Sequence, residues 1–205
     1  MGIYLNSDDT DFRSAVKYSR IYVDKTELIR YTNSVLFGEQ KYICVSRPRR
    51  FGKSMAANML TAYYSRGCDS RGLFQGLKIA THPDFEKHLN QYNVIHLNMR
   101  DYLTESENMK QLIQFVEDDL LDELQQEFSD LRMPRRKTLV KVLEQAFVQY
   151  KIPFVFIIDE WDCIFRVHKS DAASQKDYLD FLRNLLKDKS YIALAYMTGI
   201  LPIKK

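Results

Sequence analysis

The sequence predicts an α/β fold in which helices cover both faces of a parallel β-sheet. Three observations lead to this expectation. Short apolar runs alternate with segments whose apolar residues recur at helical spacing, which implies right-handed crossovers between parallel strands. Residues 154–158 are all apolar, as suits a parallel strand that is buried on both faces. A length of 205 residues, 45% of them hydrophobic and 28% charged, is ordinary for a globular protein of about one domain.

The predicted strands cover residues 41–46, 93–99, 154–158 and 191–197. The predicted helices cover residues 11–16, 26–36, 53–66, 107–128, 137–150 and 175–187. The helix at 107–128 is strongly amphipathic, and we interpret its apolar stripe as core packing rather than as a partner site. The helix at 53–66 is expected to end at Gly67 in a left-handed cap.

Residues 42–54 predict a β-strand that runs into a phosphate-binding turn and then into a helix. The turn ends in Gly52, Lys53 and Ser54. In such a turn backbone N–H groups surround an anion, the lysine reaches the outer phosphates, and the hydroxyl ligates Mg²⁺ at a helix N-terminus. Arg47 stands where the general pattern has glycine. Taken alone, Gly-Lys-Ser is explained better by an ordinary turn that begins a helix.

The predicted ligand of this turn is a nucleoside triphosphate with Mg²⁺. Its expected contacts are the consecutive residues Arg47, Pro48, Arg49, Arg50, Phe51, Gly52, Lys53, Ser54 and Met55.

Two carboxylates follow the buried run at 154–158, and they strengthen the nucleotide interpretation. Such strands present catalytic side chains at their carboxyl ends. Asp159 is expected to hold Mg²⁺ together with Ser54, and Glu160 to orient or deprotonate the attacking water. Lys53 and Glu160 are therefore candidate catalytic residues.

Three segments resemble the bacterial AAA-ATPase-like family, which is related to archaeal and STAND-type P-loop ATPases. They are Tyr22-Val23-Asp24-Lys25-Thr26, residues 46–54 and residues 158–162. The resemblance spans nearly the whole chain and implies a P-loop NTPase three-layer sandwich that binds and hydrolyses ATP. In that family Arg-Pro-Arg-Arg-Phe-Gly-Lys-Ser is the usual loop, so Arg47 agrees with the relatives. Many members also carry a C-terminal PD-(D/E)XK nuclease-like domain, which is not visible in this sequence.

The resemblance also implies a role for Thr198, at the end of the last predicted strand. In P-loop ATPases with an extra strand between the two motif-bearing strands, a polar residue at this position senses the γ-phosphate. An ordinary strand-ending Thr-Gly turn explains Thr198 equally well. The expected division is an N-terminal helical extension at 1–36 and an ATPase core at 37–205. Because only seven residues follow Thr198, we expect the core to be C-terminally truncated, without the last strand and the lid.

Other sequence features narrow the class of protein. The net charge of +3 is too small to require a nucleic-acid partner, so nucleic acid enters only by analogy with the family. Three scattered cysteines and four histidines show no metal-ligand spacing. No apolar run approaches the roughly 20 residues of a membrane span, and the N-terminus does not resemble a signal peptide, so we expect a cytoplasmic protein.

Two alternatives to an ATPase stay open. One is a non-catalytic module whose nucleotide occupancy sets a conformation that a protein partner or a second copy reads. The other is the ATPase part of a nuclease-linked, nucleic-acid-processing protein, which depends on the family analogy alone.

Overall fold

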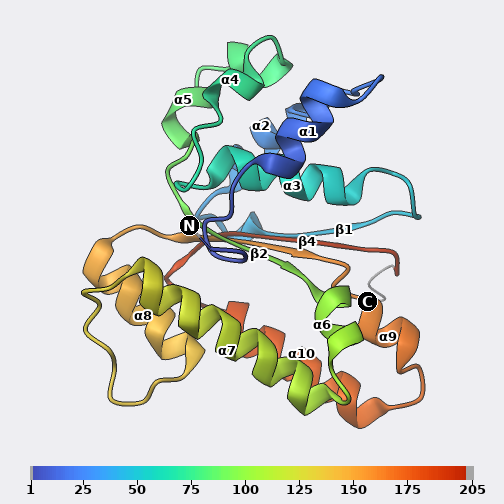
Figure 1. Ribbon diagram of the computed structural model, residues 1–205, viewed down its shortest axis with the longest axis vertical. Coiled ribbons are helices and arrows are strands. Elements are labelled where there is room, and N and C mark those ends of the chain that lie inside the picture. The colour runs from blue at the N-terminus through green and yellow to red at the C-terminus, as the bar shows by residue number, and fades with distance from the viewer. Residues whose placement is uncertain (1, 202–205) are drawn as a thin grey trace.

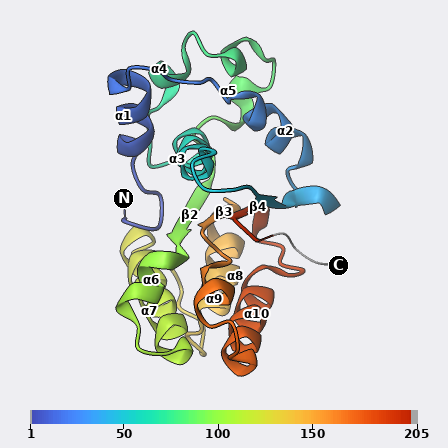
Figure 2. The ribbon, with the colours of Figure 1, turned by 90° about the vertical axis from the view of Figure 1, so that its right-hand side faces the viewer.

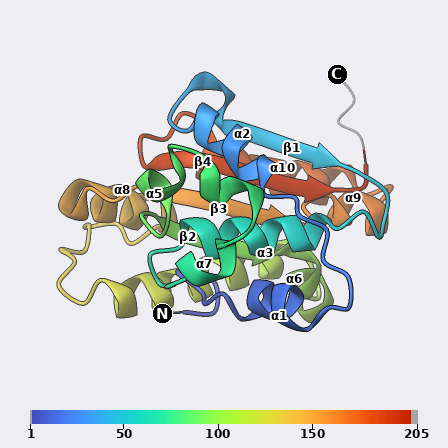
Figure 3. The same cartoon turned by 90° about the horizontal axis from the view of Figure 1, so that it is seen from above.

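The computed structural model describes residues 2–201, which form a four-stranded parallel sheet between two layers of helices (Figures 1 and 2). The strands lie in the order β1-β4-β3-β2 (Figure 3). Their bounds are β1 Tyr42–Ser46, β2 Asn93–Asn98, β3 Phe154–Asp159 and β4 Ile192–Gly199. The predicted α/β class, parallel sheet and three-layer arrangement are confirmed.

Each face of the sheet is covered by its own group of helices (Figure 1). One group comprises α1 Thr10–Tyr18, α2 Glu27–Val35, α3 Lys53–Tyr64, α4 Arg71–Phe74 and α5 Phe85–His88, with 3₁₀ turns η1 Glu39–Lys41 and η2 Lys78–Thr81. The other comprises α6 Met99–Glu105, α7 Met109–Glu127, α8 Leu139–Tyr150, α9 Cys163–Val167 and α10 Ala172–Leu186.

Strand β3 connects the two hydrophobic cores, since its residues alternate between the faces of the sheet. Phe154, Phe156 and Ile158 pack with apolar residues of α7, α8 and α10. Val155 and Ile157 pack on the opposite face with residues of α3 and the N-terminal helices. All five side chains are fully buried, as the uninterrupted apolar run predicts.

The N-terminal helices belong to the same hydrophobic layer as α3. Phe12 of α1 and Ile29 of α2 are buried in one cluster with Tyr63 and Leu194. Phe12 also stacks on Phe74, with ring centroids 5.2 Å apart. These contacts fix the N-terminal segment onto the sheet, while the division of the chain at residue 36 stays a prediction.

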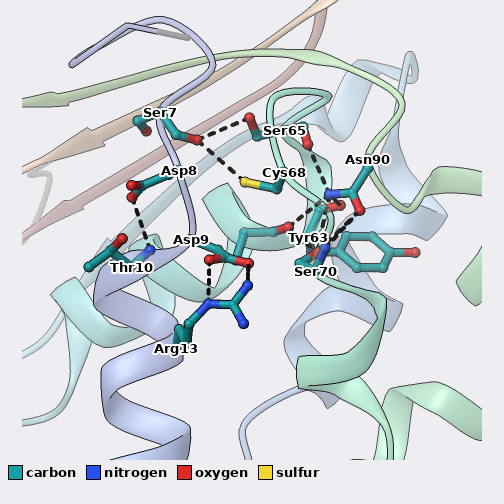
Figure 4. Close-up of polar contacts among 11 residues, drawn as sticks. Ser7, Asp8, Asp9, Thr10, Arg13, Tyr63, Ser65, Cys68, Ser70 and Asn90 are labelled. Carbon is teal, nitrogen blue, oxygen red and sulfur yellow. Dashed lines mark hydrogen bonds and ion pairs between the residues drawn. The ribbon is translucent and has the colours of Figure 1, made fainter.

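The predicted C-terminus of α3 is wrong. The helix ends at Tyr64, Ser65 is extended, and Gly67 is not among the left-handed glycines of residues 2–201. Asn90 takes the place of the cap: its side-chain amide donates to the carbonyls of Ala62 at 3.0 Å and Ser65 at 2.9 Å (Figure 4). These bonds satisfy carbonyl groups at the end of the helix. Gly67 is required by close packing instead, since a Cβ there would lie 2.3 Å from the Asn6 carbonyl oxygen.

Other differences are at element ends and in short helices. Strand β2 ends at Asn98, not at residue 99, because the Asn98 side chain accepts the N–H of Arg100 and so begins α6. Helix α10 begins three residues earlier than predicted, because Asp171 accepts the N–H of Ser174. The short helices α4, α5, α6 and α9 were not predicted, since four to seven residues carry little periodicity.

Candidate functional site

The loop between β1 and α3 is attached to the end of β4. The backbone N–H of Arg47 donates to the Gly199 carbonyl at 3.1 Å, and the Ser46 hydroxyl donates to the Ile200 carbonyl at 2.9 Å. Gly199 is also the register partner of Ser46. The loop therefore leaves the sheet beside the carboxyl end of a neighbouring strand, where α/β proteins place their ligands.

The loop reaches α3 through two left-handed residues. Arg50 has φ 69°, and Gly52, the N-cap of α3, has φ 72°. Glycine adopts this conformation readily, whereas arginine does so at a cost of about 1–2 kcal/mol. The first backbone N–H groups of α3, from Lys53 onward, have no partner inside the helix, which makes this terminus suitable for an anion.

The predicted nucleotide contacts lie together in this loop and in the first turn of α3. Residues 47–51 are exposed, with Phe51 61% accessible. Lys53 bends back over the loop, and its ammonium donates to the carbonyls of Arg47 at 2.9 Å and Pro48 at 3.0 Å. Ser54 is exposed in the first turn.

Asp159 and Thr198 meet at the carboxyl edge of the sheet, because β3 and β4 are neighbours. The Thr198 hydroxyl donates to the Asp159 Oδ1 atom, and the backbone N–H of Glu160 donates to the same atom at 2.9 Å. Both side chains are buried, Asp159 at 5% and Thr198 at 0% exposure. Among residues 2–201 nothing donates a hydrogen bond to Oδ2 of Asp159, so this oxygen can accept a cation.

Glu160 forms an ion pair with Arg166 of α9. Its backbone is left-handed, with φ 52°, so the chain turns sharply after β3. Arg166 also lies 3.5 Å from an oxygen of Asp162, which is fully buried and accepts the N–H groups of Ile200 and Leu201 at 2.8 and 2.6 Å. Burial alone would lower the pKa of Arg166, but the hydrogen bond to Glu160 and the charge of Asp162 raise it.

Trp161 joins this acidic loop to β4. Its backbone N–H donates to the Thr198 carbonyl at 3.1 Å, and its carbonyl accepts the hydroxyl of Tyr178 at 2.9 Å. The ring packs against Phe165 with centroids 5.6 Å apart. A Cβ on Gly199 would lie 2.9 Å from Nε1 of Trp161, so the small residue after Thr198 allows this close approach.

A cavity of about 470 Å³ opens between the loop, α6 and α9. Three arginines line it, Arg49, Arg100 and Arg166, and no sequence motif indicates a role for the last two. A larger cavity of about 660 Å³ lies between the N-terminal segment, α3 and β2, and none of the predicted site residues lines it. Only the smaller of the two adjoins the candidate site.

Sequence reasoning also missed a lysine at the loop. The ammonium of Lys25 donates to the Phe51 carbonyl at 2.8 Å. Its segment, residues 22–26, carries part of the family resemblance, which by itself implies no role for Lys25. No periodicity or spacing connects Lys25 with a loop 26 residues later, so only the fold reveals the contact.

Two other types of site are absent from residues 2–201. That range contains no cluster of three or more His, Cys, Asp or Glu residues able to hold a metal ion. Mg²⁺ commonly takes only one or two carboxylates together with phosphate oxygens, so this absence does not bear on the predicted pair of Asp159 and Ser54. Within the same range, each helix is too short or too polar to cross a membrane.

The parallel sheet, its strand order and its two layers of helices define an α/β sandwich like that of P-loop NTPases. The family model for AAA-ATPase-like proteins, described as predicted AAA-ATPase, matches residues 9–205. The chain therefore belongs to the AAA-ATPase-like family. A comparison with curated proteins found no match.

Proposed function

We propose that this protein binds ATP with Mg²⁺ and hydrolyses it. The strongest support is the position of β4 between β1 and β3. In this order Thr198 directly precedes Gly199, the residue of β4 to which the loop after β1 is hydrogen-bonded. Thr198 also lies next to the end of β3, where its hydroxyl donates to Asp159. A phosphate-binding loop, a polar strand end and a carboxylate thus share one edge of the sheet, as phosphoryl transfer requires.

Each residue has a distinct task in this proposal. Lys53 leaves the Arg47 and Pro48 carbonyls and neutralises the outer phosphates, while the N-terminal N–H groups of α3 bind phosphate oxygens. Ser54 and Asp159 hold Mg²⁺, which offsets negative charge on the phosphates. Thr198 orients Asp159 and contacts the γ-phosphate. Residues 47–52 and Met55 form the walls of the phosphate site.

Glu160 is the proposed general base. It follows Asp159 directly and emerges where the chain leaves the sheet, so its carboxylate can accept a proton from the attacking water. In the structure the carboxylate is paired with Arg166, and that pair must open or rotate before Glu160 can act. The pair therefore also supports a second candidate function, a non-catalytic switch that binds ATP and whose nucleotide-bound conformation a partner reads.

The predicted partners and the predicted cellular location have weaker support and stay proposals. The switch requires a protein partner or a second copy of the chain. A nucleic-acid partner is suggested by family analogy alone. A cytoplasmic location also stays a prediction.

The deciding experiment measures ATP affinity with and without Mg²⁺ in the parent and in Lys53→Ala. A lost charged hydrogen bond costs about 1.5–3 kcal/mol, which corresponds to roughly a 10- to 150-fold weaker affinity. Lys137→Ala is the matched control, because Lys137 is exposed in the connection between α7 and α8. Affinity of Lys53→Ala within twofold of the parent would show that the loop is not a phosphate site.

A further inference from the structure

We propose that Lys25 is a second phosphate-binding lysine of this site, supplied by the segment that precedes α2. The inference rests on the proposed function, because it assumes that the loop binds a nucleotide. It assigns to the N-terminal segment a direct part in binding.

The contact that carries the proposal is at the start of α3. Nζ of Lys25 donates to the Phe51 carbonyl at 2.8 Å and lies 2.5 Å from where a Cβ on Gly52 would be. An ammonium has three N–H donors, and among residues 2–201 this is its one hydrogen bond. The remaining donors of Lys25 are therefore available to a ligand at the loop.

The segment on either side of Lys25 is fixed by hydrogen bonds. Thr26 is fully buried, and its hydroxyl donates to Asp24 at 2.7 Å and accepts the N–H of Ile79 at 3.1 Å. The other oxygen of Asp24 accepts the N–H of Lys78 at 2.9 Å. Burial alone would raise the pKa of Asp24, but the hydrogen bonds from Thr26 and Lys78 lower it. Lys25 is thus presented to the loop from a rigid backbone, which reduces the entropy lost on binding.

Electrostatics favour a ligand-binding role over a merely structural one. A carbonyl such as that of Phe51 can be satisfied by any neutral donor. A positive charge beside a helix N-terminus is unfavourable, because that end of the helix dipole is itself positive. Lys53 and the loop arginines Arg47, Arg49 and Arg50 belong to the same loop and helix start, and within the described part of the chain no carboxylate forms an ion pair with them or with Lys25. A polyphosphate would relieve the repulsion among these five cations.

The test compares three substitutions of Lys25 by calorimetric titration with ATP, ADP and AMP. Lys25→Met removes the charge and the donor, Lys25→Gln keeps a donor for the Phe51 carbonyl, and Lys25→Arg keeps the charge. We expect Met and Gln to weaken ATP binding at least tenfold, with smaller losses for AMP, and Arg to retain most of the affinity. Lys17→Met, at an exposed position on α1, is the control and should bind as the parent does.

Three results would overturn the proposal, and each has a different meaning. If Lys25→Gln binds ATP as the parent does, the lysine only holds the Phe51 carbonyl. If Lys53→Ala loses ATP binding while Lys25→Met stays within twofold of the parent, Lys25 makes no phosphate contact and the proposed function stands. If the parent itself does not bind ATP, both proposals fail. Melting temperatures without nucleotide identify any variant that has lost its fold.

Discussion

Arg166 of α9 neutralises Glu160, the carboxylate that follows β3, and the two side chains are each about one-fifth exposed. The same guanidinium approaches the buried Asp162, so one cation lies between two acids. Its Nε atom is buried and has no hydrogen-bond partner within the described residues. The proposed general base is therefore restrained by a side chain of its own chain.

Replacement of Glu160 by Gln should separate binding from hydrolysis. The amide keeps the shape of the side chain but cannot accept the proton of water, so turnover should fall about a hundredfold or more. ATP affinity should be retained. Steady-state phosphate release at saturating ATP measures the effect, with Glu144→Gln, whose ion pair with Lys141 lies on α8, as control. Equal turnover in Glu160→Gln and the parent would exclude Glu160 as the base and favour the switch.

Replacement of Arg166 by Met should destabilise the protein while removing the restraint on Glu160. Two carboxylates lose a partly buried counter-charge, which we expect to lower the free energy of unfolding by about 1–3 kcal/mol. Urea denaturation measures this change. Arg183→Met is the control, because its ion pair with Asp180 is solvent-exposed and is expected to contribute little to stability. If the two variants lose the same stability, the Arg166 pair contributes no more than a surface pair.

Replacement of Thr198 by Val should leave Asp159 without its hydroxyl donor at nearly constant side-chain volume. A buried carboxylate that loses a hydrogen bond destabilises the fold by about 1.5–3 kcal/mol. ATP turnover should fall as well, since the orientation of Asp159 is lost. Thr198→Ser keeps the hydroxyl and should stay close to the parent in both stability and turnover. If Thr198→Val has the stability and the ATP turnover of the parent, Thr198 is only an ordinary residue at the end of a strand.

Stability should fall as the pH drops below about 6.5, partly because of His96. Burial lowers the pKa of His96, and the nearby Asp159 and Asp11 only partly oppose this effect. The unfolded chain then binds more protons than the folded one below the ordinary histidine pKa of about 6.5, so acid favours unfolding. Urea midpoints at pH 7.5 and 5.5 should differ less in His96→Gln than in the parent. His88, whose pKa burial also lowers, contributes in the same direction in both proteins. An unchanged difference would show that His96 does not carry the effect.

The sequence was most informative where burial and chemistry act together locally. The run that forms β3 is apolar on both faces. A buried parallel strand that ends in two acidic residues could therefore be predicted from the residues of this segment alone. Gly52 likewise marks a turn that requires a left-handed residue. The long helices followed from their periodicity.

Contacts between distant segments could not be predicted in this way. The amide of Asn90 replaces the glycine cap of α3, because the loop after α5 happens to pass the helix end. The pairing of Glu160 with Arg166 depends on α9, which is too short to leave a periodic signal. The position of β4 in the sheet was available only from the family resemblance, since four parallel strands can be ordered in several ways.

Two consecutive carbonyl groups of β4 hold the two loops of the site. The Thr198 carbonyl accepts the N–H of Trp161 from the loop after β3, and the Gly199 carbonyl accepts the N–H of Arg47 from the loop after β1. A shift of either loop must therefore pull on one of two adjacent peptide units at the end of β4. The loop after β1 and the loop after β3 are attached to adjacent residues of β4. A displacement of one loop is therefore expected to reach the other directly through the backbone of this strand.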